Sequence, residues 1–183
     1  MSQIRRRHIG QDKIIENVLP PDYHREEYVS GPFTTKLVTS VNKLLGTWVL
    51  DVESGNTDSQ MIISCQTTTG GGYAGVSGGK YWLGGGISSR TSCIGRQTLS
   101  VYFQINSIYL EVNGETVSRT GSAPNDTVEL FSGNGGYRYT GKIYSVKCIN
   151  DSAVLFDGVP VTRISDDKQG IYDFVSSTFY PKN

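Results

Sequence analysis

Short strand-like segments recur along almost the whole chain and constrain its fold more than any other feature. From Tyr23 to Tyr180, runs of alternating apolar and polar residues are separated by Gly, Asn, Asp or Pro, with no helical period between them. Repeated strands at this spacing are typical of antiparallel sandwiches. The 22 glycines among 183 residues agree with a fold that has many turns. The sequence therefore predicts an all-β protein in which any helix is minor.

Two segments give sharp local predictions. "GTWVLDVES" predicts a strand around Thr47 to Glu53, with Trp48 facing the core. Asn113 and Gly114 stand between two alternating runs, and both residues tolerate the positive φ that a type I′ turn requires. We therefore expect a β-hairpin centred on this pair.

The C-terminal segment "GIYDFVSSTFY" carries many bulky apolar residues for a chain end. A mobile tail of this composition would expose a large apolar surface, so we expect it to dock on the core. Ser176 and Ser177 divide the segment and predict a closing hairpin.

The bulk composition bears on several classes of partner. Lys plus Arg and Asp plus Glu each total 17, so the formal net charge is zero and attraction to nucleic acid is not expected. No run of about 20 apolar residues is present, which argues against insertion in a membrane, and the N-terminus lacks the apolar stretch of a secretion signal. Cys65, Cys93 and Cys148 are widely spaced, so we expect buried or inert thiols rather than a disulfide framework or a zinc site.

The N-terminus differs in character from the rest. Pro20 and Pro21 forbid a continuing helix and divide the chain into an arm, residues 1–20, and a sandwich domain, residues 21–183. The arm, roughly Met1 to Asn17, combines basic residues with isoleucines. It is either a short helix or extended peptide that lies on a partner, or a mobile solvated terminus. The candidate anchoring residues are Ile4, Arg5, Arg6, Arg7, His8 and Ile9.

Three parts of the sequence resemble one known family. The order "GKIYSVKCINDSAVLFDGVPV", followed by "GIYDFVSSTFY", is similar to the closing segment of laminin-G-like, concanavalin A-like jelly-roll domains of bacteriophage virion proteins. "LPPDYHREEYV" resembles the entry strand of that family, and "IRRRH" resembles the basic leader of its phage members. The middle of the chain matches only in the rhythm of its strands.

The resemblance implies an antiparallel jelly roll and a non-enzymatic phage structural protein. Such a protein decorates the capsid, or belongs to a head fibre or the tail, and is made in the host cytoplasm before it enters the virion. Its arm would anchor it to other virion proteins, and its sandwich would face outward, where it could form homo-oligomers and touch host glycans. The alternative is a stand-alone carbohydrate-binding module of a gut bacterium or prophage.

A glycine-rich region contains the candidate glycan-binding residues Tyr73, Tyr81 and Trp82. Small neighbours leave an aromatic face open, and such a face can stack on a sugar ring. In the alternative interpretation Tyr81 and Trp82 pack in the core while the glycines form turns and bulges. The "GGGYAG" run formally matches a dinucleotide-binding motif, but no helix is expected after it, so no cofactor is predicted.

Two carboxylates raise the question of catalysis. Asp51 and Glu53 project from one face of the predicted strand, as acid and nucleophile do in some glycosidases. The third carboxylate of the usual motif is missing, since residue 55 is glycine, and a solvated sheet face is the preferred interpretation. We also expect no metal site, because the aspartates after Asn150 lack a calcium-loop spacing.

Overall fold

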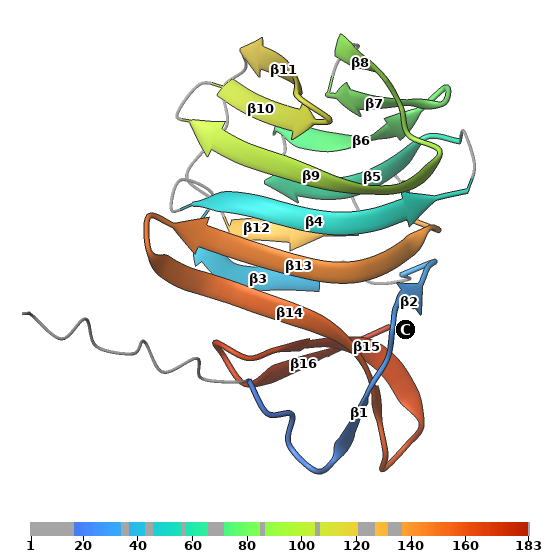
Figure 1. Cartoon of the computed structure of the whole chain (residues 1–183), viewed down its shortest axis with the longest axis vertical. Helices are drawn as coiled ribbons and strands as arrows, with labels where there is room; N and C mark the ends of the chain where they lie inside the picture. The colour runs from blue at the N-terminus through green and yellow to red at the C-terminus, as the bar shows by residue number, and fades with distance from the viewer. Residues whose placement is uncertain are drawn as a thin grey trace, which may run out of the picture.

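The structure, a computed structural model, describes residues 17–33, 37–42, 46–55, 58–65, 72–84, 87–104, 107–120, 127–131 and 137–182. These residues form sixteen strands and no helix. The strands belong to two antiparallel sheets that pack face to face (Figure 1). The predicted all-β sandwich is confirmed at this level.

The larger sheet contains ten of the described strands. Eight of them lie in the order β11 (Glu115–Thr120), β10 (Ser107–Val112), β9 (Gly95–Gln104), β4 (Thr47–Ser54), β13 (Lys142–Asn150), β14 (Ala153–Arg163), β15 (Lys168–Asp173) and β16 (Thr178–Pro181). Two short strands join them: β1 (Tyr23–Arg25) pairs with β14, and β2 (Val29–Ser30) pairs with β13.

The smaller sheet lies behind the larger one in Figure 1. Its six described strands have the order β3 (Leu37–Asn42), β12 (Thr127–Leu130), β5 (Gln60–Cys65), β6 (Tyr73–Ser77), β7 (Lys80–Leu83) and β8 (Ile87–Ser92). Strands β6, β7 and β8 follow one another in the chain and pair as a meander.

The core lies between the two sheets because the alternation of each strand turns its apolar residues inward. In β4 the side chains of Trp48, Leu50 and Val52 are fully buried, which confirms the predicted strand and its inward face. The ring of Trp48 lies 5.5 Å from that of Phe156 on β14. Cys93 and Cys148 are buried free thiols, as expected.

Both predicted hairpins are present. Asn113 and Gly114 have φ values of 49° and 75°, and Val112 on β10 pairs with Glu115 on β11, so the turn has the expected two residues. At the end of the chain Asp173 pairs with Thr178, and the turn between them contains Ser177 at a φ of 52°.

The start of the described chain is built into the same sheet as its end. Strand β1 pairs with the second half of β14, and β2 pairs with the first residues of β13, where β13 and β14 have separated. Leu19 and Tyr23 pack on a second small apolar cluster with Val159, Val161 and Tyr172. The predicted anchoring residues, from Ile4 to Ile9, lie outside the described residues, and so does the predicted form of the arm.

Candidate functional site

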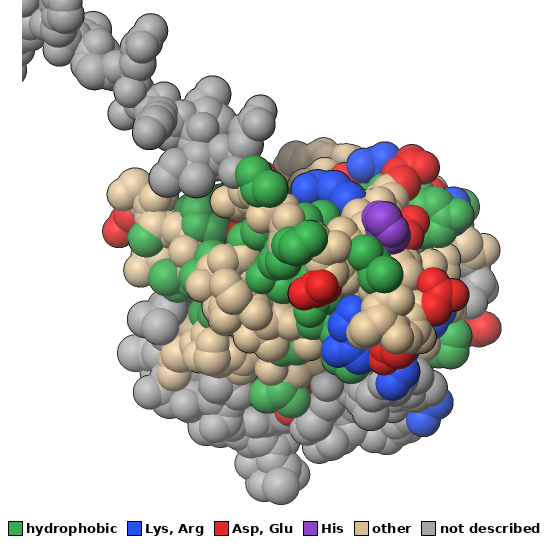
Figure 2. Space-filling model, turned by 90° about the horizontal axis from the view of Figure 1, so that it is seen from below, with side chains coloured by type: hydrophobic (Ala, Val, Ile, Leu, Met, Phe, Trp, Pro, Cys, Tyr) green, Lys and Arg blue, Asp and Glu red, His purple; other side chains and the backbone are tan. Residues whose placement is uncertain are grey.

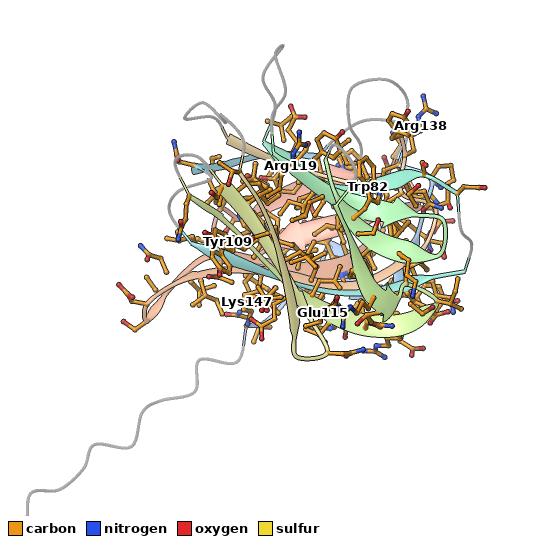
Figure 3. The ribbon with its side chains drawn as sticks, turned by 90° about the horizontal axis from the view of Figure 1, so that it is seen from above. Trp82, Tyr109, Glu115, Arg119, Arg138 and Lys147 are labelled. Carbon is orange, nitrogen blue, oxygen red and sulfur yellow. The ribbon has the colours of Figure 1, made fainter. Side chains whose placement is uncertain are left out.

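One edge of the sandwich is closed by contact between the two sheets. Strand β11, the last strand of the larger sheet, lies against β8 and β7 of the smaller sheet (Figures 1 and 3). Because side chains alternate along a strand, Glu115, Val117 and Arg119 all face the other sheet. Val117 packs on the core between its two polar neighbours.

Glu115 joins the sheets through its carboxylate. The backbone N–H of Arg90 on β8 donates to both oxygens, at 2.7 and 3.0 Å, and the N–H and hydroxyl of Thr91 donate to Oε2 at 2.9 and 2.8 Å. These bonds, above all the one from the Arg90 backbone, hold the pKa of Glu115 below its ordinary value. Glu115 is therefore a structural clasp between the sheets.

We expect Glu115→Gln to lower the unfolding temperature at neutral pH, since an amide accepts fewer hydrogen bonds and carries no charge. A carboxyl whose pKa is lower in the folded state stabilises the fold above its unfolded pKa of about 4.3 and loses this effect as the pH falls through the folded value. The difference between wild type and variant should therefore shrink below about pH 4. Thermal melts from pH 3 to 7 test this, with the exposed Glu111→Gln as the matched control. Equal melts for wild type and Glu115→Gln at pH 7 would contradict it.

An aromatic and cationic cluster lies further along the same edge. Tyr73 on β6 and Trp82 on β7 are half-buried, and their rings meet edge to face with centroids 5.0 Å apart. A Cβ on Gly84 would lie 2.6 Å from the Tyr73 ring and 2.9 Å from Nη1 of Arg119. Only the missing side chain of Gly84 leaves room for the phenol ring and the guanidinium to lie side by side there. We call Tyr73, Trp82, Gly84 and Arg119 the edge cluster.

Two polar groups of the edge cluster have no partner among the described residues. The indole Nε1–H of Trp82 is buried without an acceptor, and the half-buried Arg119 has no described carboxylate within ion-pair distance. Buried donors are normally satisfied, so each such group needs an explanation. Figure 3 shows Arg119 and Trp82 near each other, with Glu115 away from them.

Tyr81 does not belong to this cluster. Its ring is 1% exposed between the sheets, and burial raises the pKa of its phenol. A side chain so enclosed cannot stack on a sugar, so its assignment as a glycan-binding residue is corrected to a core residue. The physical reason is the alternation of β7, which turns Tyr81 inward and leaves Trp82 half-exposed.

The two carboxylates considered for catalysis lie on the outer face of the larger sheet, each beside its own cation. Asp51 pairs with Arg96 at 2.7 Å. Glu53 accepts hydrogen bonds from the Tyr144 hydroxyl at 2.6 Å and Lys142 at 3.0 Å, and these lower its pKa. A glycosidase general acid needs a raised pKa instead, so Glu53 does not fit that role.

The other features considered from the sequence are placed as follows. Tyr73 of the "GGGYAG" run enters strand β6, so no helix offers its N-terminus there. Asp157 pairs with Lys147, and Asp166 pairs with Arg163. The described part of the chain contains no group of three or more acidic, His or Cys side chains placed to hold a metal ion.

The sequence analysis proposed Tyr73 and Trp82 as candidates, whereas it did not single out Arg119 or Glu115. The signal was weak, because Val117 is the single apolar residue of "ETVSRT" and does not by itself mark the inward side of the strand. A basic residue on the side shared with Val117 was the one available clue.

Comparison with known proteins identifies no relative: no protein-family model matches the sequence, and no curated protein matches it at a significant level. Across the described residues, no helix is long and apolar enough to cross a membrane.

Proposed function

We propose that this protein is a non-enzymatic structural protein of a bacteriophage virion, with a sandwich of the concanavalin A-like jelly-roll type. The N-terminal arm anchors it to capsid or tail proteins, and the sandwich faces outward, where the edge cluster contacts host glycans. The sequence resemblance to virion jelly rolls motivates this proposal. The observation that supports it most is that the start of the described chain and the edge cluster lie at opposite ends of the molecule.

The chain leaves its arm at one end and presents the edge cluster at the other. Asn17, where the described chain begins, donates a hydrogen bond from Nδ2 to Asp157 at 2.8 Å, and Leu19 packs beside β14 to β16. These strands lie at the lower end of Figure 1, whereas β7, β8 and β11 lie at the upper end of the long axis. A molecule anchored to the particle by its arm would hold its edge cluster away from the point of attachment.

The surface at the lower end is also suited to contact with another protein. Val18, Ile164 and Val175 belong to segments at this end and are 81%, 51% and 50% exposed. Figure 2 views this end and shows apolar side chains gathered on it, with charged groups beside them. Apolar surface next to the arm supports a contact with the particle there.

Deleting residues 1–16 should abolish incorporation into particles, because the anchoring residues are removed while Asn17 and Leu19 keep their contacts. Virions assembled with the truncated chain are purified on a density gradient and probed for it. Thermal melting of the isolated truncated chain serves as the folding control and should match the full chain. Particles that still carry the truncated chain would contradict the anchoring role.

A stand-alone carbohydrate-binding module is the second candidate, and the partly exposed rings of Tyr73 and Trp82 favour it. In that case glycan binding is lost in Trp82→Ala while the arm has no effect on location. Loss of glycan binding in Trp82→Ala is expected under both candidates, so the arm deletion is the experiment that separates them.

A further inference from the structure

We infer that the edge cluster binds a sugar residue that carries a carboxylate, with the guanidinium of Arg119 as the group that recognises the acid. This inference rests on the proposed glycan contact and specifies its chemical class. It adds Arg119, which the aromatic pattern alone did not indicate, to Tyr73 and Trp82.

The first step of the argument is the state of Arg119. Several other long cations of the described residues pair with acids, among them Arg96 with Asp51, Lys142 with Glu53, Lys147 with Asp157 and Arg163 with Asp166. Arg119 has no such partner in that part of the chain although it is half-buried. Partial burial of a guanidinium without a counter-charge is costly, and an anionic ligand would offset that cost.

The second step concerns Glu115, the acid on the same face of β11. It stands four residues before Arg119, which along a strand is about 13 Å. Its carboxylate is already engaged by four contacts to Arg90 and Thr91. Glu115 is therefore fixed on β8 and does not pair with Arg119, so the described residues leave this positive charge without an acid.

The third step is the surroundings of the guanidinium. The Tyr73 ring and Arg119 Nη1 flank the same point over Gly84, and the indole of Trp82 meets Tyr73 at 82°. An aromatic surface beside a planar guanidinium group, which can donate two parallel hydrogen bonds, suits a molecule with an apolar ring face and a carboxylate. The Nε1–H of Trp82 is itself buried, so the ring faces rather than this donor would meet a ligand. An acidic monosaccharide unit combines an apolar ring face with a carboxylate.

The outer face of the larger sheet fits this chemistry less well. It also carries aromatic rings beside cations, since Arg96 lies over the Tyr144 ring at 3.7 Å and Lys142 lies over the Tyr28 ring at 4.7 Å. There, however, each cation already has a carboxylate partner. An anionic ligand would have to displace an internal acid on that face, whereas at the edge cluster it would not.

The test uses the full-length chain on an array of uronic-acid and sialic-acid glycans, each printed beside its carboxyl-reduced neutral counterpart. Wild type should prefer the acidic member of a bound pair about tenfold to a hundredfold, the range of a charge-assisted hydrogen bond. Arg119→Gln should remove this preference, and Arg119→Lys should restore part of it. Trp82→Ala should weaken binding to both members.

The matched control is Arg138→Gln, which removes the same charge from an exposed arginine that is not part of the edge cluster and should leave the preference intact. Unfolding midpoints establish that each variant is folded. Equal binding of acidic and neutral members by wild type, or a preference that survives Arg119→Gln, overturns the inference but leaves the glycan contact standing. If no glycan binds at all, the inference and the glycan contact both fail, and the anchoring role is judged separately by incorporation.

Discussion

Phe156→Ala is expected to lower the free energy of unfolding by about 3–5 kcal/mol, the usual range for removing a buried phenylalanine. The Phe156 side chain is 1% exposed, and its ring lies 5.5 Å from Trp48 and 6.0 Å from Tyr180. It therefore joins the centre of the core to the last strand, β16. The residue fills the space above Gly158, where a Cβ would lie 2.5 Å from its ring. Alanine would leave a cavity between Trp48, Gly158 and Tyr180.

Denaturant unfolding followed by tryptophan fluorescence measures this loss, because Trp48 lies against Phe156. Val154→Ala is the matched control, since Val154 is on the same strand but 42% exposed, and it should change stability by less than about 0.5 kcal/mol. Similar midpoints for the two variants would show that the closing hairpin is not tied to the core through Phe156.

Asp173→Ala is expected to cost about 3 kcal/mol by leaving several donors of the closing hairpin without an acceptor. The Asp173 side chain is 2% exposed. Its carboxylate accepts hydrogen bonds from the backbone N–H of Asp157 at 2.8 Å and from those of Val175 and Ser176 at 3.1 Å. The Ser176 hydroxyl donates a further bond at 2.6 Å. One side chain thus fixes the β15–β16 turn and attaches it to β14.

Hydrogen exchange gives a local measurement of the same change. In Asp173→Ala the amides of Asp157, Val175 and Ser176 should exchange faster than in wild type, whereas amides of β9 and β10 should change only with global stability. Asp22→Ala removes an exposed carboxylate near the same end and should leave both stability and exchange unchanged. Unchanged protection of the three amides in Asp173→Ala would contradict the assigned role.

Local chemistry made part of this fold predictable. Asn113 and Gly114 could be assigned to a hairpin because few other dipeptides accept positive φ at both positions. The inward face of β4 followed from strict alternation around Trp48. In each case a short stretch of sequence is sufficient to explain the local structure.

The edge cluster was harder to predict from the sequence, because pairing between strands that are distant in the chain creates it. Tyr81 and Trp82 are neighbours with the same composition around them, and only the position of β7 in the smaller sheet decides which ring is enclosed. Arg119 acquires its surroundings from β6 and β7, which lie more than thirty residues earlier in the chain. No local pattern in "ETVSRT" contains that information.

The long axis of the molecule runs across its strands rather than along them (Figure 1). Backbone hydrogen bonds of an antiparallel sheet also point across the strands, so tension between the two ends would act along these bonds. The larger sheet would then resist the tension through successive rows of hydrogen bonds between neighbouring strands. The load would pass from β14 through β13, β4 and β9 to β10 and β11. The Glu115 clasp transfers part of that tension to β8 in the second sheet. Force applied at the edge cluster would therefore reach both sheets rather than the larger sheet alone.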